Sequence, residues 1–68
     1  MKMRISLIGA GRVAHHLAKA LMSQHEIINI YSRSFDKAAD LAQVVHAKAV
    51  SHFQQLNVDV DLVMIAVS

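Results

Sequence analysis

Two glycines and an alanine lie close together near the amino terminus, in the segment GAGRVA of residues 9–14. The segment follows an apolar run and precedes apolar residues spaced four apart, which is the order of a strand, a loop and a helix. In the pattern G-x-G-x-x-G/A, such a loop holds the pyrophosphate of a dinucleotide. Gly9 allows a sharp turn, Gly11 lets the phosphates approach the backbone, and Ala14 lets the helix pack closely.

The first turn of the predicted helix offers further groups to this ligand. The N–H groups of Arg12 and Val13 are expected to point at it, because a helix N-terminus attracts anions. The Arg12 side chain either contacts phosphate or is solvated, and the residues favour neither. For the loop as a whole the alternative is an ordinary structural turn, but its place between a strand and a helix favours nucleotide binding.

The end of the second predicted strand determines which nucleotide fits. NAD-dependent proteins carry an Asp or Glu here, about 20 residues after the glycines, which binds the ribose hydroxyls. This chain has Ser32, Arg33 and Ser34 instead. A carboxylate would repel a 2′-phosphate, whereas hydroxyls and a planar guanidinium donate hydrogen bonds to it. The residues therefore favour NADP(H) over NAD(H).

Two alternatives stay open at this second site. Arg33 is either a phosphate contact or a solvated loop residue, in which case Ser34 only caps the following helix. Lys37 lies one turn further on and either adds a positive charge to the phosphate site or is solvated.

Other chemistries find little support. The chain has no cysteine, which excludes disulfides and thiolate sites. The adjacent His15 and His16 point about 100° apart on a helix and cannot share an ion, so no metal site is predicted. Asp59 and Asp61 precede the last strand, away from the carboxyl ends where ligands bind, and are expected in a solvated connection. No residue is predicted to act as a catalytic acid, base or nucleophile.

Strands and helices alternate along the chain and must position these residues. Apolar runs predict strands over residues 3–8, 26–32, 47–50 and 62–67. Helical spacing predicts one helix from Val13 to near Ser23, a second from its N-cap Ser34 to Val45, and a single turn capped by Ser51. This alternation predicts an α/β fold, the first half of a Rossmann-type parallel sheet with right-handed crossovers and strand order 3-2-1-4.

Three groups of apolar residues are expected to be buried. The first helix shares one apolar face between Val13, Leu17 and Leu21 and, beside them, Ala10, Ala14 and Ala18. The second helix should bury Ala38, Leu41, Ala42 and Val45. The run from Leu62 to Val67 does not alternate, which predicts a central strand buried on both faces.

Length and composition limit the class of protein. The 68 residues suffice for one small domain, and 54% of them are hydrophobic, which indicates a folded chain. The net charge of +2 comes from scattered residues and predicts no nucleic-acid partner. No apolar stretch approaches the roughly 18 residues of a membrane span, so we expect a cytoplasmic protein with no membrane partner. The chain stops directly after its most apolar strand, which predicts that residues 1–68 are the amino-terminal dinucleotide-binding fragment of a longer protein.

Three segments, ISLIGAGRVAHHLAKAL, IYSRSFDKAADLA and DLVMIAVS, resemble the amino-terminal Rossmann domain of a group of reductases. The group includes the pyrroline-5-carboxylate reductases and the deazaflavin-dependent NADP oxidoreductases. The resemblance is greatest to a related branch of Rossmann-like oxidoreductases whose helical carboxyl-terminal domain has no assigned function. In the group, that domain forms the substrate pocket and often a dimer, and it lies outside these 68 residues.

The resemblance also implies which residues contact the cofactor. The phosphate loop maps to Gly9, Gly11, Arg12, Val13 and Ala14, the 2′-phosphate contacts to Ser32, Arg33 and Ser34, and backbone contacts with the cofactor ribose to Ala66 and Val67.

We therefore expect the NADP(H)-binding domain of an oxidoreductase. Hydride would pass between the nicotinamide and a small imine, ketone or deazaflavin substrate bound by the rest of the protein. The alternative is a module that senses a nucleotide without turnover, although such modules usually keep the acid that Ser32 replaces here. A methyltransferase-type domain would require acids before the glycine loop and after the second strand, and both are missing. A homodimer formed through the open sheet is a further expectation.

Overall fold

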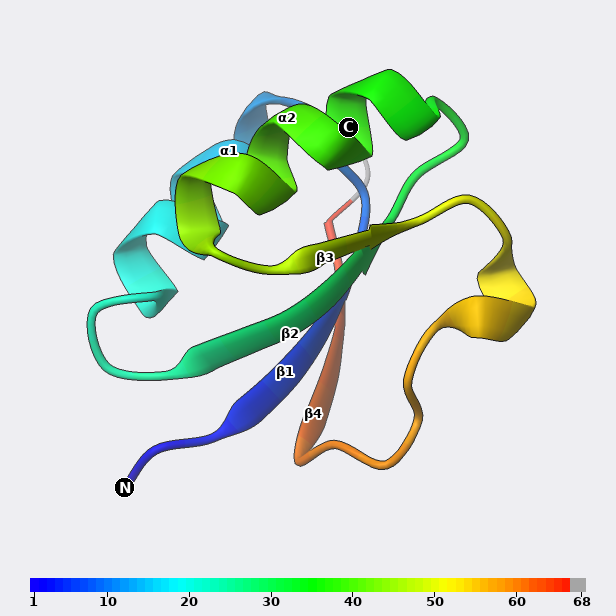
Figure 1. Cartoon of the computed structure of the whole chain (residues 1–68). Helices are drawn as coiled ribbons and strands as arrows, with labels where there is room; N and C mark the ends of the chain where they lie inside the picture. The colour runs from blue at the N-terminus through cyan, green and yellow to red at the C-terminus, as the bar shows by residue number, and fades with distance from the viewer. Residues whose placement is uncertain (67–68) are drawn as a thin grey trace.

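A four-stranded parallel sheet is the centre of the computed structural model, which describes residues 1–66 (Figure 1). Its strands are β1 (Arg4–Ile8), β2 (Glu26–Tyr31), β3 (Lys48–Val50) and β4 (Leu62–Ile65), joined by α1 (Arg12–Leu21), α2 (Phe35–Val45) and the 3₁₀ turn η1 (Phe53–Gln55). The strand order is β3-β2-β1-β4 and every pair is parallel, which confirms the predicted α/β class and topology.

The two α-helices lie over one face of the sheet, while the β3–β4 connection with η1 passes on the other side (Figure 1). This arrangement follows from right-handed crossovers, because the chain moves outward from β1 to β3 and then returns past β1 to β4. The carboxyl ends of all strands therefore meet at one edge, where α1 and α2 begin.

The hydrophobic core lies between the helices and the sheet. Ile5, Leu7 and Ile30 from the strands are fully buried there. Along α1 the buried residues are alanines, which lets the helix approach the strands closely, and Leu17 and Leu21 pack partly buried at their side. The predicted face of α2 is confirmed, since Ala38, Leu41, Ala42 and Val45 are all buried.

Val13 departs from its predicted place in the core and is 47% exposed. It stands in the first turn of α1, so the apolar face of this helix consists of Ala14 and Ala18 with the two leucines, and Ala10 is buried in the loop before the helix. The prediction of one shared face was therefore wrong for this residue.

The predicted burial of the last apolar run was also wrong. Within the described residues β4 pairs with β1 alone, and Val63 and Ile65 are 42% and 66% exposed. The reason is its place at the sheet edge, since α1 and α2 pack on β2 and β3 and leave the β4 side uncovered. Val67, the end of the predicted run, lies outside the described residues.

Several predicted boundaries shift by a few residues. The strands begin or end slightly inside the predicted ranges, and α1 ends at Leu21, where Gln24 and His25 donate their N–H groups to the Leu21 carbonyl. Ser51 was wrongly predicted to cap the short turn. The N-cap is His52, whose N–H donates to Gln55 Oε1 at 3.2 Å, so the glutamine side chain closes the turn from the other end.

Polar contacts at the amino ends of the strands fasten β4 to β1. The Asp61 carboxylate accepts the Arg4 N–H at 2.8 Å, and the Asp61 N–H donates to the Arg4 carbonyl at 2.9 Å. Arg4 Nη1 also donates to the Asp59 carbonyl at 2.9 Å. Both aspartates are exposed, as predicted, and their contacts are structural ones far from the carboxyl ends of the strands.

Candidate functional site

The loop between β1 and α1 is held by both neighbouring strands. The Gly9 N–H donates to the Tyr31 carbonyl at 2.8 Å, and the Ala66 N–H donates to the Ile8 carbonyl at 2.9 Å. Gly9 has φ = 122°, and a Cβ atom there would collide with the Ala66 carbonyl oxygen. The fold itself therefore requires a glycine at this position.

Gly11 has no comparable conformational reason to be a glycine. It is the N-cap of α1 with φ = −81° and ψ = −165°, an extended backbone that other residues adopt readily. Its carbonyl accepts the His15 N–H at 2.9 Å and so begins the helix. No side chain caps α1 within the described part of the chain, and its first turn holds no acid. Because Gly11 has no side chain, it offers no cap of its own to the N–H groups of the first turn of α1.

A cleft of about 600 Å³ opens at the carboxyl ends of the strands, bounded by this loop, the β2–α2 loop and the end of β4. Among the described residues that line it, Arg33 contributes a guanidinium group and Lys37 an ammonium group, and none contributes a carboxylate. The lining residues are Ile8, Gly9, Ala10, Gly11, Tyr31, Ser32, Arg33, Ser34, Lys37 and Ala66.

The cleft brings together most residues that the sequence pointed to. Those that meet there are Gly9, Gly11, Ser32, Arg33, Ser34, Lys37 and Ala66. Val13 and Ala14 do not line it: Ala14 is fully buried against the core, and Val13 is exposed in the first turn of α1. Val67 lies outside the described residues.

The β2–α2 loop presents polar groups to the cleft. Ser32 Oγ accepts the Ser34 N–H at 3.3 Å, which holds the turn between the strand and the helix. Ser34 is the N-cap of α2, as predicted, but its side chain makes no capping hydrogen bond within residues 1–66. Arg33 and Lys37 are both exposed, so their charged ends are accessible to a ligand from solvent.

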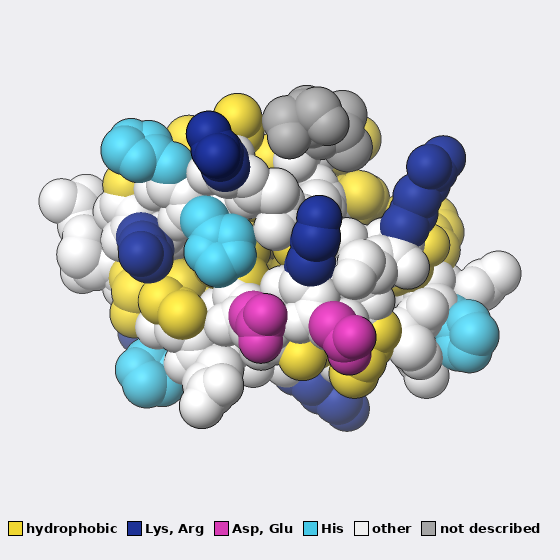
Figure 2. Space-filling view, turned by 90° about the horizontal axis from the view of Figure 1, so that it is seen from above, with side chains coloured by type: hydrophobic (Ala, Val, Ile, Leu, Met, Phe, Trp, Pro, Cys, Tyr) yellow, Lys and Arg dark blue, Asp and Glu magenta, His cyan; other side chains and the backbone are white. Residues whose placement is uncertain are grey.

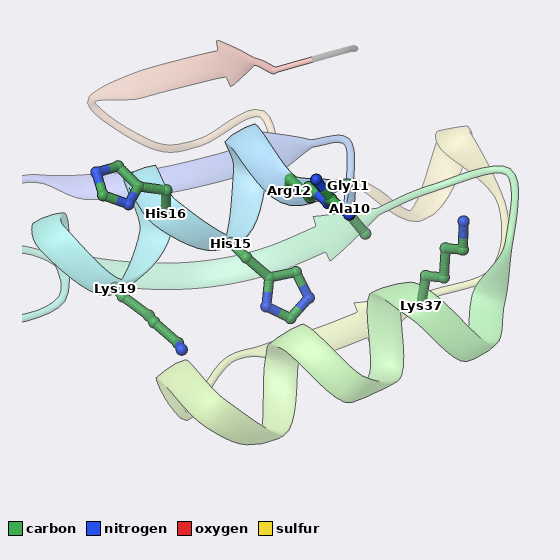
Figure 3. A pocket seen from close by; sticks show the side chains of 7 residues that line it. All are labelled: Ala10, Gly11, Arg12, His15, His16, Lys19 and Lys37. Atoms are coloured by element: carbon green, nitrogen blue, oxygen red, sulfur yellow. The ribbon is translucent and has the colours of Figure 1, made fainter.

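A second, shallower groove of about 490 Å³ adjoins the cleft and shares Ala10, Gly11 and Lys37 with it (Figure 3). Its remaining lining residues are Arg12, His15, His16 and Lys19 of α1. His15 and Lys19 extend toward α2, and His16 points away from it (Figure 3). Arg12, one of the predicted phosphate contacts, belongs to this groove rather than to the cleft.

The helix-covered face around this groove carries lysine, arginine and histidine side chains, with acidic side chains near its centre (Figure 2). Every titratable group that lines the groove is basic. Basic groups gathered in this way attract anions toward the groove. In the described part of the chain no three potential metal ligands come together, and no helix is long and apolar enough to cross a membrane.

Sequence reasoning missed Ile8, Ala10 and Tyr31 as parts of the cleft. All three flank the residues that it did identify, and Tyr31 ends β2 directly before Ser32. Ile8 and Tyr31 end β1 and β2, and Ala10 lies in the loop after β1, so the rule that ligands bind at the carboxyl ends of parallel strands could have identified them.

Solved structures show the same architecture. A Bacteroides fragilis protein assigned as an NADP oxidoreductase superposes with a TM-score of 0.93 at 35% identity, over 98% of this chain and 26% of that one. Myo-inositol dehydrogenase from Corynebacterium glutamicum superposes at 0.84 with 28% identity, over 100% and 22% of the two chains. UDP-N-acetylglucosamine 3-dehydrogenase from Acidithiobacillus ferrooxidans shares the fold, with a TM-score of 0.86 at 22% identity over the same shares.

The chain thus spans about a quarter of the length of the solved structures that it matches. No curated protein sequence matches it. The profile of one protein family, described as NADP oxidoreductase, coenzyme F420-dependent, matches residues 4–68. Coenzyme F420 is a deazaflavin, so the predicted resemblance to the deazaflavin-dependent NADP oxidoreductases is confirmed. The chain belongs to the coenzyme F420-dependent NADP oxidoreductase family, and these residues form its Rossmann-like nucleotide-binding half-domain.

Proposed function

We propose that the cleft binds NADP(H), with the pyrophosphate at Gly11 and the 2′-phosphate at the β2–α2 loop. One observation supports this proposal above all: the start of α1, which no side chain caps, lines the same cleft as Ser32, Arg33 and Lys37. No carboxylate is among the described residues that line this cleft. That both places line one cleft suits a dinucleotide, because its adenosine ribose is joined directly to its pyrophosphate.

The chain's own groups divide the work of holding the cofactor. The first-turn N–H groups of Arg12 and Val13 would donate to the pyrophosphate, aided by the positive end of α1. Ser32 and Arg33 would donate hydrogen bonds to the 2′-phosphate, and Lys37 of α2 would add a positive charge to the cleft. Ala66, and Val67 beyond the described residues, would meet the nicotinamide-side ribose with their backbone.

For the whole protein we propose an oxidoreductase. The nicotinamide supplies a hydride donor or acceptor when bound, and this domain orients it. The family description favours a deazaflavin substrate over an imine or a ketone, with the substrate bound by parts of the protein beyond these residues. Location in the cytoplasm and assembly into a homodimer stay predictions.

Calorimetric titration of NADPH and NADH into the chain tests the cofactor assignment. NADPH is expected to bind more tightly, and Arg33→Ala should weaken NADPH binding by about tenfold or more while changing NADH little, because a hydrogen bond to a charged group contributes about 1.5–3 kcal/mol. Lys48→Ala, which removes an exposed charge outside the cleft, is the control. An equal loss for both cofactors would remove Arg33 from the 2′-phosphate site.

Turnover separates an enzyme from a sensing module. The full-length protein is expected to transfer hydride between NADPH and a deazaflavin. Tight NADPH binding without reduction of any deazaflavin, imine or ketone would favour a module that senses the nucleotide.

A further inference from the structure

Tyr31 is the one aromatic residue among the described residues that line the cleft. It ends β2 and directly precedes Ser32 and Arg33. Its carbonyl accepts the Gly9 N–H at 2.8 Å, which ties it to the phosphate loop. Tyr31 therefore stands between the two places at which we propose the pyrophosphate and the 2′-phosphate.

A second aromatic ring lies against Tyr31. The ring centroids of Tyr31 and Phe53 are 5.8 Å apart and their planes are inclined by 79°, an edge-to-face pair. Phe53 begins η1, in the connection between β3 and β4, and it remains 56% exposed. A large apolar side chain that packs against one other ring and stays more than half exposed has surface left for a ligand.

Hydrogen bonds fix η1, and thereby Phe53, in this position. Gln55 Oε1 accepts the N–H groups of Ser51 and His52, each at 3.2 Å, and lies 3.3 Å from Ser51 Oγ. The Leu56 N–H donates to the Phe53 carbonyl at 3.0 Å, and the Leu56 side chain is buried. The half-exposed ring is therefore held by a closed turn rather than by a loose loop.

The chemistry of NADP(H) places a flat ring at this point. Its adenine is attached to C1′ of the ribose whose C2′ carries the extra phosphate, so the base lies one sugar ring from that phosphate. A 2′-phosphate at Ser32 and Arg33 thus brings the purine to the neighbourhood of Tyr31. Purine faces bind aromatic side chains well, and Tyr31 is the one aromatic residue among the described residues that line the cleft.

We propose that Tyr31 and Phe53 form an aromatic wall against which the adenine of NADP(H) lies, an assignment that rests on the proposed function. Tyr31 contributes the surface inside the cleft. Phe53 does not line the cleft itself, but it supports the Tyr31 ring and extends the wall beyond it. The η1 turn contains none of the cofactor-binding residues that the sequence predicts, and this proposal makes it part of the cofactor site.

The chain contains a built-in reporter for this contact. Tyr31 is its single tyrosine and it has no tryptophan, so ultraviolet-excited emission comes from Tyr31. Titration with adenosine 2′,5′-bisphosphate, the adenine half of NADP(H), is expected to change this emission saturably. Inorganic pyrophosphate, which carries no base, should leave it nearly unchanged while still binding by calorimetry.

Two phenylalanine variants give a matched comparison. Phe53→Leu should weaken adenosine 2′,5′-bisphosphate binding by about threefold to tenfold and leave pyrophosphate binding unchanged, because stacking on the base alone is reduced. Phe35→Leu makes the same change at the other phenylalanine, which is 46% exposed. Neither phenylalanine lines the cleft, but in the described part of the chain only Phe53 is paired with the Tyr31 ring, so Phe35→Leu should alter neither affinity. Circular dichroism melting of both variants checks that the fold is kept.

The outcomes separate this proposal from the function beneath it. If adenosine 2′,5′-bisphosphate binds to the wild-type chain without changing Tyr31 emission, and binds Phe53→Leu equally well, the aromatic wall is wrong while the cofactor assignment stands. If the bisphosphate does not bind at all, the cofactor assignment fails and the wall with it. The wild-type emission titration decides the matter even if a variant does not fold.

Discussion

Gly9 lies against the Ala66 carbonyl so closely that no side chain fits between them. The end of β4 and the β1–α1 loop are therefore built as one unit, joined also by the hydrogen bond from the Ala66 N–H to Ile8. The two glycines of the loop therefore differ: the fold requires Gly9, whereas the backbone of Gly11 does not require a glycine, and we propose that Gly11 leaves room for the pyrophosphate.

Replacement of Gly9 by alanine should destabilise the protein. The added Cβ meets backbone rather than a flexible side chain, and φ = 122° is a strained conformation for alanine. We expect the free energy of unfolding to fall by about 2 kcal/mol or more, measured by urea denaturation. Unchanged stability would mean that the loop and β4 are free to move apart.

The buried pair of Ser6 and Asn29 should also matter for stability. Ser6 Oγ lies 2.8 Å from Asn29 Oδ1 and 2.6 Å from the Asn57 carbonyl oxygen, and a hydroxyl has a single hydrogen to donate. We expect Ser6 to donate to Asn57 and to accept from the Asn29 amide, turned so that its NH₂ group faces Ser6.

Ser6→Ala leaves the buried Asn29 side chain and the part-buried Asn57 carbonyl without this partner, and should cost about 1–3 kcal/mol of unfolding free energy. Ser23→Ala, at an exposed serine whose hydroxyl donates to the Ala20 carbonyl at 3.2 Å, is the matched control and should change stability by less than about 0.5 kcal/mol. Equal effects of the two substitutions would argue against the buried network.

Asp61 should act on stability and not on cofactor binding. Asp61→Ala removes the acceptor for the Arg4 N–H and should cost about 0.5–1.5 kcal/mol, while Asp61→Asn keeps an oxygen acceptor and should recover part of the loss. Asp59→Ala removes an exposed carboxylate but keeps the backbone carbonyl that accepts from Arg4, so it should have little effect on stability. A loss of NADPH affinity in Asp61→Asn would place this carboxylate nearer the site than the fold does.

Lys19 tests the basic groove beside the cleft. It lines that groove but not the cleft, so Lys19→Glu should slow NADPH association several-fold at low salt and leave dissociation nearly unchanged. Stopped-flow kinetics at low and high ionic strength measure both rates, and the difference should shrink as salt screens the charges. An effect confined to dissociation would indicate direct contact with the bound cofactor.

Local patterns predicted those parts of the fold that depend on neighbours along the chain. Residues spaced three and four apart determined the buried face of α2, and the glycines between a strand and a helix pointed to the loop that Gly9 and Gly11 form. The strand order followed from the alternation of elements, because parallel strands leave few allowed crossovers.

What depends on distant neighbours was missed. The apolar sequence of β4 shows that the strand is hydrophobic, but it does not show which elements pack on it. The exposure of Ile65 could therefore not be predicted. Tyr31 and Phe53 are 22 positions apart in the sequence and meet only when the chain has folded past β3. No local sequence pattern predicts this pair. The role of Gln55 in closing η1 is likewise a tertiary detail of the connection.

The measurement that bears most directly on the site is a comparison of melting temperature and NADPH affinity in Gly11→Ala. Since φ at Gly11 is −81°, alanine fits the backbone, and its methyl group occupies the space in front of the first turn of α1. We expect the melting temperature to stay within a few degrees of wild type while NADPH affinity falls at least tenfold. Undiminished NADPH binding by a folded Gly11→Ala protein would contradict the assignment of the pyrophosphate to this helix start.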